Sequence, residues 1–315
     1  MSYMGPQNVI SALEKGEIPP SQALKLFHEM DFKVRMSTKV HHSQKKIDDI
    51  LSELNQLIGL SEVKKTVREI YAFIEIQRRR EKEHLHTEPL VLHMIFKGNP
   101  GTGKTTVARI LSKIFREIGI LSRGHLIEVE RADLVGEYIG HTAQKTREQV
   151  KKASGGILFI DEAYSLARGG EKDFGKEGID LLVKAMEDHK NDFILILAGY
   201  QKEMERFLET NPGLRSRFPI HIDFPDYKEQ ELLTIAQQML GARQYSISNE
   251  TADVLLTLLA THQHNAPKNF GNARTVRNII EKAIRQQALR LISKANTTKE
   301  ELMCLESVDF LEVKS

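Results

Sequence analysis

Cysteine is almost missing from this chain. Cys304 is the only cysteine among the 315 residues, so no disulfide can form within the chain. A single free thiol in a chain of this length fits a reducing compartment. Because Cys304 lies far in the sequence from the motifs described below, we interpret it as a buried bystander rather than as a nucleophile.

Long apolar runs, a signal sequence and an excess of one charge are missing as well. No apolar run approaches the length of a membrane span, and the first residues lack a charged segment followed by an apolar one. The formal net charge of +2 is too balanced to imply a nucleic acid or a membrane surface as an obligatory partner. These absences predict a cytoplasmic protein without a membrane span, and they argue against nucleic acid as a partner.

Composition and hydrophobic pattern divide the chain into three parts. An apolar content of 40% and a charged content of 28% describe an ordinary globular protein, and 315 residues are long for a single core. Residues 1–50 predict a helical appendage, with one short helix on each side of Pro19 and Pro20 and a polar linker over residues 33–46. Residues 226–315 carry helical patterns throughout and predict an all-helical lid domain.

Residues 51–225 alternate strand patterns with helical patterns. Residues 51–80 predict helix with a break over residues 58–61. Five short apolar runs follow and predict strands, over residues 90–96, 126–129, 157–160, 193–197 and 220–224. This alternation predicts an α/β domain with a parallel five-stranded sheet and helices on both faces.

The run Gly98-Asn99-Pro100-Gly101-Thr102-Gly103-Lys104-Thr105 fits the phosphate-loop pattern G-x-x-x-x-G-K-[ST] at every position. It lies between a predicted strand and a helical pattern over residues 107–121, which is the context that the motif requires. Glycines let backbone N–H groups approach phosphates, and the helix N-terminus adds partial positive charge. The sequence therefore predicts ATP binding by this run and Thr106, with Lys104 at the β- and γ-phosphates and the Thr105 hydroxyl as an Mg²⁺ ligand.

A second acidic motif follows the buried run over residues 157–160. Asp161 and Glu162 come directly after it, and ligands of parallel sheets bind beyond the carboxyl ends of the strands. We expect Asp161 to hold Mg²⁺ and Glu162 to polarise the attacking water. The alternative is a pair of residues that caps a helix, which the preceding phosphate loop disfavours.

Four further segments stand among and after these two motifs. They are Gly136-Glu137-Tyr138-Ile139-Gly140, Leu197-Ala198-Gly199-Tyr200, Asn211-Pro212-Gly213-Leu214-Arg215-Ser216-Arg217-Phe218-Pro219 and Gly271-Asn272-Ala273-Arg274. Over residues 54–292, the order of all six motifs resembles the CbbX/CfxQ family of AAA+ ATPases, which includes red-type rubisco activases and sporulation proteins. The sporulation members are the nearest match. The resemblance implies an AAA+ phosphate-loop NTPase fold followed by a helical lid.

The resemblance also implies roles for three arginines. Arg217, or failing that Arg215, would act as an arginine finger that reaches the ATP of a neighbouring subunit. Arg274 would contact the γ-phosphate and couple the lid to the nucleotide state. Two surface arginines and a plain helix start are the alternative interpretations of these segments.

The glycine-flanked segment around Tyr138 resembles the loop with which AAA+ remodellers grip polypeptide. The resemblance implies a pore loop made of Tyr138, Ile139 and Gly140. An aromatic ring suits such a loop because it packs against many kinds of side chain. A tyrosine of the hydrophobic core is the alternative. Residues 168–175 would form a second, more polar pore loop, or a mere surface loop.

Two positions of the nucleotide site are less well defined by the resemblance. Tyr200 stands where many AAA+ proteins carry a polar Asn or Thr that orients water, so its role as the first sensor is open. Ile58 and Gly59 resemble the linker that packs near adenine, which is usually held by apolar and backbone contacts.

Together these motifs imply a Mg²⁺-dependent ATPase that forms a homo-oligomeric ring, expected to be a hexamer. It would convert ATP and water to ADP and phosphate and remodel a protein client through a central pore, with an implied role in sporulation. The nearest alternative is a rubisco activase of the red type. Two other classes are a nucleic-acid-remodelling AAA+ protein, which the balanced charge disfavours, and a nucleotide-gated scaffold, which Glu162 and the two candidate finger arginines disfavour.

Overall fold

The structure is a computed structural model, and it describes residues 6–15, 18–88, 90–138, 140–168, 174–189, 192–265 and 270–311. The chain forms two compact units, one over residues 1–52 and one over residues 53–315. None of the helices in the described ranges has the length and apolar content that crossing a bilayer requires.

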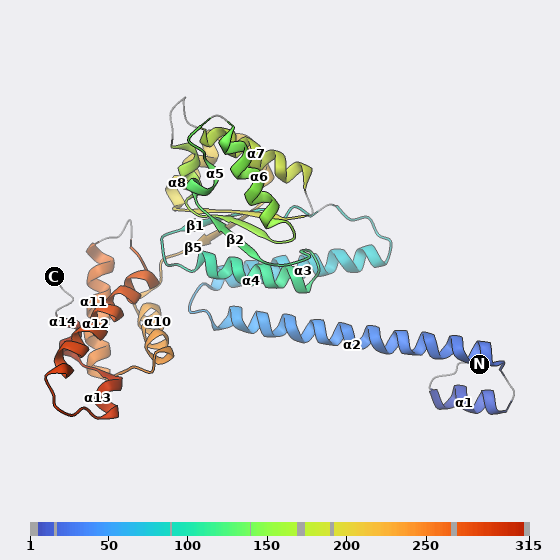
Figure 1. The fold of residues 1–315 in the computed structure, drawn as a ribbon, viewed down its shortest axis with the longest axis horizontal. Helices are drawn as coiled ribbons and strands as arrows, with labels where there is room; N and C mark the ends of the chain where they lie inside the picture. The colour runs from blue at the N-terminus through green and yellow to red at the C-terminus, as the bar shows by residue number, and fades with distance from the viewer. Residues whose placement is uncertain are drawn as a thin grey trace. The chain divides into compact units, whose positions relative to one another are not determined.

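The N-terminal unit is a helical hairpin (Figure 1). Helix α1 (Pro6–Glu14) and the first turns of α2 (Pro20–Gln56) bury Val9, Ala12 and Ala23 together. Helix α2 continues without a break through residues 33–46, so the predicted linker there is wrong. The physical reason is that residues 21–56 contain neither glycine nor proline, which would break a helix. The segment is polar on average, but its many lysine, glutamine and leucine residues all favour helix.

The second unit contains the predicted parallel five-stranded sheet. Its strands are β1 (Met94–Gly98), β2 (Leu126–Val129), β3 (Ile157–Ile160), β4 (Ile194–Gly199) and β5 (Ile220–Phe224). Their order in the sheet is β2-β3-β4-β1-β5, and all neighbours are parallel. Every residue of β3 and β4 is buried, as expected for central strands covered on both faces.

Strand β1 begins four residues later than the apolar run predicts. The imidazole of His93 accepts the backbone N–H of Leu195 through Nδ1 at 3.0 Å. A side chain thus takes the position that a backbone carbonyl would take in a longer strand, and the pairing with β4 starts at Met94.

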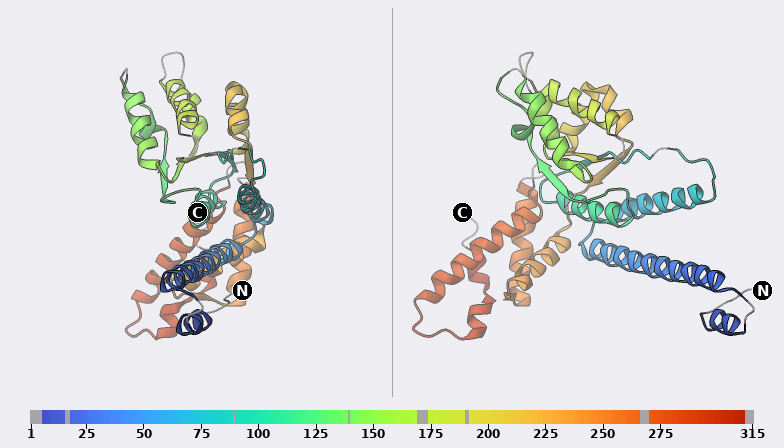
Figure 2. Two further views of the ribbon diagram at one scale, coloured as in Figure 1. Left: turned by 90° about the vertical axis from the view of Figure 1, so that its right-hand side faces the viewer. Right: turned by 45° about the vertical axis from the view of Figure 1, so that its right-hand side comes forward.

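Helices cover both faces of the sheet (Figures 1 and 2). Helices α3 (Ser61–Lys82) and α4 (Lys104–Glu117) lie on one face, and α6 (His141–Ala153), α7 (Gly175–Asp188) and α8 (Gln201–Thr210) lie on the other. Short helices connect them, namely α5 (Arg131–Leu134), the 3-10 helix η1 (Ala163–Ala167) and α9 (Pro212–Arg217). The break predicted between α2 and α3 is present, since α2 ends at Gln56 and α3 begins at Ser61.

The lid that follows the sheet is helical, as predicted, with one small addition. Its helices are α10 (Glu229–Ala242), α11 (Asn249–Asn265), α12 (Ala273–Ile292), α13 (Lys299–Met303) and α14 (Ser307–Leu311). Two strands of two residues each, β6 (Ser246–Ile247) and β7 (Cys304–Leu305), pair in parallel within it. Cys304 therefore lies in a strand of the lid, and it is half-buried rather than fully buried.

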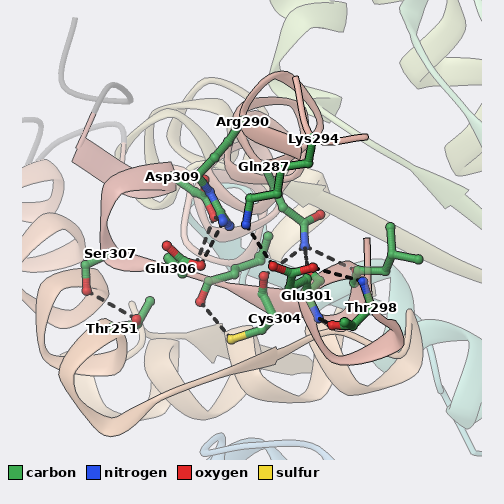
Figure 3. Close-up of polar contacts among 12 residues, drawn as sticks. Thr251, Gln287, Arg290, Lys294, Thr298, Glu301, Cys304, Glu306, Ser307 and Asp309 are labelled. Carbon is green, nitrogen blue, oxygen red and sulfur yellow. Dashed lines mark hydrogen bonds and ion pairs between the residues drawn. The ribbon is translucent and has the colours of Figure 1, made fainter. Parts of the chain in front are cut away.

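A polar seam joins α12 to the end of the lid (Figure 3). Arg290 donates two hydrogen bonds of 2.9 Å to Asp309, whose side chain is 1% exposed. The amide of Gln287 donates to the backbone carbonyls of Glu301, Leu302 and Cys304 at 2.8–3.2 Å. These side chains satisfy backbone groups that the very short β7 leaves unpaired, and they fix the last described residues on α12.

Candidate functional site

The two principal motifs meet at the carboxyl edge of the sheet. Strands β3, β4 and β1 are neighbours, so the loops that follow them end at the same edge. A cavity of about 750 Å³ opens there. From the predicted site, its lining includes Ile58, Gly98, Pro100, Gly101, Gly103, Lys104, Thr105, Thr106, Asp161, Glu162 and Arg274, and it also includes Tyr200. The structure thus brings together residues that lie more than 200 positions apart in the sequence.

The phosphate loop joins β1 directly to α4. Gly103 precedes the helix with a φ of 97°, and Lys104 is its first residue. The Lys104 Nζ atom donates to the carbonyl oxygens of Gly98 and Asn99, each at 2.9 Å. Burial lowers the pKa of the Lys104 ammonium, and the nearby Asp161 carboxylate opposes this shift. The loop therefore places the Lys104 ammonium within the cavity, at the N-terminus of α4.

Three predicted binding residues do not line the cavity. Asn99 and Thr102 belong to the loop, but the Thr102 hydroxyl is fully buried and donates to the Asn99 carbonyl at 2.8 Å. Gly59 has a φ of 60°, and a side chain there would collide with the carboxylate of Glu231. Gly59 therefore shapes the connection between α2 and α3, while its neighbours Leu57 and Ile58 reach the cavity.

Asp161 and Glu162 follow β3 on a strained turn. Glu162 has a φ of 46°, which is rare for a residue with a side chain, and its N–H donates to Asp161 Oδ1 at 3.0 Å. Strain of this kind persists where the surrounding structure fixes the backbone, and it is frequent at active sites. Both carboxylates line the cavity that holds Lys104.

The donor set of the cavity suits Mg²⁺. The Thr105 hydroxyl and the Asp161 carboxylate offer oxygen ligands, which hard cations prefer. Among the described residues, no group of three or more His, Cys, Asp or Glu side chains could hold a metal by itself. Mg²⁺ at nucleotides is ordinarily bound through one or two protein oxygens together with substrate phosphates.

The sequence interpretation did not identify Glu128, Arg109 or Arg277, which also line the cavity. Glu128 accepts from the Thr105 hydroxyl at 3.2 Å and pairs with Arg109 at 3.1 Å. Arg277 lies one turn after Arg274 on α12. Only the folded chain places β2 beside α4, so spacing in the sequence gave no signal for Glu128.

Two tyrosines stand beside the acidic pair. The rings of Tyr164 and Tyr200 have centroids 6.0 Å apart, and the Arg168 guanidinium lies 4.6 Å from the centroid of Tyr164. Burial raises the pKa of both phenols, and the charge of Glu162 adds to the shift. Gly199 makes room for this arrangement, since a Cβ there would lie 2.7 Å from the Tyr164 ring. Gly199 and Tyr200 both line the cavity at the end of β4.

The two candidate finger arginines lie on α9 and do not line the cavity of their own chain. Arg217 pairs with Glu187 at 2.5 Å and donates to the Gly213 carbonyl at 2.8 Å. Arg215 is exposed.

The predicted pore loop is only partly described. Tyr138 is 66% exposed, and its ring meets that of His141 edge to face at 5.4 Å. The alternative interpretation of Tyr138 as a core tyrosine is therefore wrong. Gly140 has a φ of 82° and precedes α6. Ile139, and residues 169–173 of the second predicted loop, lie outside the described residues.

Two family models match the chain over consecutive segments. One, described as "ATPase family associated with various cellular activities (AAA)", matches residues 94–226, and the other, described as "AAA lid domain", matches residues 228–314. The first covers the sheet with its phosphate loop and acidic pair, and the second covers the helical lid.

Relatives and solved structures agree with this match. Stage V sporulation protein K of Bacillus subtilis (strain 168) is 57% identical over 267 residues, which are 84% of this chain and 82% of that protein. The chloroplastic ribulose bisphosphate carboxylase/oxygenase activase of Cyanidioschyzon merolae is 43% identical over 281 residues, 88% and 95% of the two chains. The AAA domain of FIGL-1 in complex with ADP gives a TM-score of 0.58 at 17% identity, over 82% of each chain, and supports the fold alone. The chain belongs to the AAA ATPase family, in the branch that contains the CfxQ and CbxX proteins and Stage V sporulation protein K.

Proposed function

We propose that the chain hydrolyses ATP in the cavity at the carboxyl edge of the sheet. The observation that carries this proposal is the convergence of Lys104, Thr105, Asp161, Glu162 and Arg274 on one cavity. The apolar side chains of Leu57, Ile58, Leu60, Ile235 and Met239 line the same cavity and suit an adenine base. Cations, oxygen ligands for Mg²⁺ and a carboxylate that positions water are the parts that phosphoryl transfer to water needs, and the apolar wall serves binding of the nucleotide.

Each side chain has a role that follows from its charge and place. Lys104, at the N-terminus of α4, neutralises the phosphate oxygens, and Arg274 adds positive charge from the lid. Glu162 orients and polarises the attacking water from the strained turn after β3. Mg²⁺, held by Thr105 and Asp161, would neutralise charge on the phosphates when bound.

We propose further that the active form is a ring, expected to be a hexamer, in which each subunit supplies an arginine to its neighbour. Arg217 and Arg215 lie away from the cavity of their own chain, which supports a role at the next subunit's site. A head-to-tail interface that repeats around a closed ring meets this geometry. Arg217 remains the first candidate, with Arg215 the second.

The proposed work of the ring is to remodel a protein client in the cytoplasm. The exposed Tyr138 supports this, because an exposed aromatic side chain on a loop can grip polypeptide without sequence preference. The similarity to Stage V sporulation protein K supports a role in sporulation. The similarity to a ribulose bisphosphate carboxylase/oxygenase activase supports the second candidate, an activase that pulls on an enzyme.

The ATPase proposal is tested by two substitutions and a matched control. Lys104→Ala should abolish nucleotide binding, because it removes the cation of the loop. Glu162→Gln should bind ATP normally and hydrolyse it about 10²- to 10⁴-fold more slowly, since only the water-activating group is lost. Glu209→Gln, the same change on an exposed residue of α8, should behave as wild type. Equal ATP affinity and turnover in wild type and Lys104→Ala would contradict the proposal.

A further inference from the structure

A polar cluster links the phosphate loop to the start of the lid. It consists of Asn99, Asp226, Tyr227 and Asn272, and we call it the hinge cluster. The Asp226 carboxylate accepts from Asn99 Nδ2 at 2.9 and 3.0 Å and from Asn272 Nδ2 at 2.7 Å. Asn272 Oδ1 in turn accepts the backbone N–H of Tyr227 at 2.9 Å.

Four consecutive residues of the phosphate loop contact this part of the chain. Asn99 bonds to Asp226, and the Pro100 carbonyl accepts from Asn272 Nδ2 at 3.3 Å. The Gly101 carbonyl accepts the N–H of Ala273 at 3.3 Å, and the Thr102 carbonyl accepts the Tyr227 hydroxyl at 3.2 Å. Residues 99–102 of the loop are therefore bound to the segment that precedes α10 and to the start of α12.

The approach between loop and lid is close enough to require glycine. Gly101 has a φ of 70°, and a Cβ there would collide with the Gly271 carbonyl and lie 2.8 Å from the Arg274 nitrogen. The glycine at this position thus serves the contact with the lid, in addition to any contact with phosphate.

Asn272 holds an unusual backbone at this contact. It is fully buried, with φ of 46° and ψ of −125°, a conformation that glycine adopts readily and other residues adopt rarely. It directly precedes α12, and Arg274 is the second residue of that helix. The side-chain bonds of Asn272 therefore compensate for a backbone that sets the direction of the helix carrying Arg274.

We propose that Asp226 and Asn272 are positioning residues that hold the first turn of α12, and with it Arg274, beside the phosphate loop, so that the site distinguishes ATP from ADP. The inference rests on the proposed function, since it assigns Arg274 to the γ-phosphate. Loss of the cluster would release Arg274 from the loop. ATP would lose a contact that ADP never makes, so the preference for ATP over ADP would fall.

The test is a double-mutant cycle in a Glu162→Gln background, where ATP binds without turnover. The measured quantity is the ratio of the ADP and ATP dissociation constants. Asp226→Asn keeps the shape of the side chain and should lower the ATP preference about tenfold, which corresponds to one lost charge-assisted hydrogen bond. Arg274→Gln should lower the ATP preference by a similar factor. The double variant should have an ATP preference little lower than that of either single variant, because both changes remove the same contact.

Two further variants separate positioning from charge and from backbone strain. Removing the negative charge of Asp226 would by itself favour the more highly charged ATP, which is opposite to the predicted change. Asn272→Gly accepts the backbone conformation but removes the side-chain bonds, so it should also lower the ATP preference. Asp223→Asn makes the same chemical change on an exposed residue of β5 that pairs with Lys97, and it should leave the ratio unchanged within about twofold.

Three outcomes would overturn the inference. The first is a ratio of ADP and ATP dissociation constants that equals that of the Glu162→Gln parent in both Asp226→Asn and Asn272→Gly. The second is full additivity of the effects of Asp226→Asn and Arg274→Gln on this ratio. In either case, normal binding by the parent would leave the proposed ATPase standing. If the Glu162→Gln parent bound neither nucleotide, the proposed function would fail together with the inference.

Discussion

At the scale of single residues, His93 shows how a buried titratable group is kept neutral. Its ring lies 6.0 Å from those of Phe193 and Phe218, and its Nδ1 accepts the Leu195 N–H. Burial lowers the pKa of His93 to about 4, so the folded chain keeps this ring uncharged at neutral pH. Only an unprotonated Nδ1 can accept the hydrogen bond from the Leu195 N–H.

This predicts a pH-dependent stability. The unfolded chain protonates His93 below about pH 6.5 and the folded chain only below about pH 4, so the unfolded state binds more protons in between. The free energy of unfolding should therefore fall by about 2 kcal/mol between pH 7 and pH 5 on account of His93 alone. Urea unfolding of wild type and His93→Asn at both pH values checks this. The variant should show a smaller difference, and an equal pH dependence in the two proteins would contradict the assignment.

Tyr138 supports a second prediction at this scale. Since its ring is 66% exposed, Tyr138→Ala should leave the melting temperature nearly unchanged and keep basal ATPase activity within a few fold. If Tyr138 belongs to the proposed pore loop, client remodelling or spore formation should fail, because the substitution removes the aromatic side chain that would grip polypeptide. Tyr245→Ala, on a half-buried lid residue, serves as a comparison aromatic outside the loop. Normal remodelling by Tyr138→Ala would reject the pore role.

At the scale of elements, the seam between α12 and α14 depends on one buried ion pair. The Asp309 carboxylate accepts from Arg290 and also from the Glu306 N–H at 2.8 Å (Figure 3). Asp309→Asn should lower the free energy of unfolding by about 3 kcal/mol, because it removes the buried counter-charge of Arg290 and leaves only the exposed carboxylate of Glu306. Glu306→Gln alters the exposed partner of the same arginine, and it should cost less than about 1 kcal/mol. Urea unfolding that gave equal losses for both variants would contradict this account of the seam.

The elements themselves were largely predictable from local patterns. The bounds predicted for β2, β3 and β5 are those of the structure, because each is a short run of apolar or alternating residues that ends where the pattern ends. The linker predicted over residues 33–46 is wrong because polar residues alone do not end a helix, and no helix breaker is present there. Strands β6 and β7 are two residues long, which is too short for any periodicity to appear.

The predictions for the site were limited by what only the folded chain brings together. The phosphate loop, Asp161, Glu162 and Arg274 carry local motifs, and they line one cavity. Tyr164, Glu128 and Asp226 carry no such pattern, since their relevance arises from contacts between elements distant in sequence. Likewise, Gly101 and Gly199 are required by the Gly271 carbonyl and the Tyr164 ring, contacts that no spacing rule indicates.

At the scale of the whole molecule, the proposed ring brings an arginine of one subunit to the nucleotide cavity of the next. The AAA and lid matches together span residues 94–226 and 228–314, the part of the chain that holds every proposed catalytic residue. If the ring is the active form, specific ATPase activity should rise with protein concentration as subunits associate. An arginine supplied in trans contributes about 10³- to 10⁵-fold in related sites, so Arg217→Ala should bind ATP yet hydrolyse it poorly.

The most direct measurement is the ATPase activity of mixed rings. Glu162→Gln and Arg217→Ala should each be nearly inactive alone, because the first lacks the base and the second lacks the finger at every interface. In an equal mixture, about one interface in four pairs an intact Glu162 with an intact neighbouring Arg217, so about a quarter of the wild-type rate should return. Arg215→Ala in place of Arg217→Ala tests the second candidate in the same way. If neither mixture exceeded the activity of its separate components, hydrolysis with an arginine from the neighbouring subunit would be contradicted.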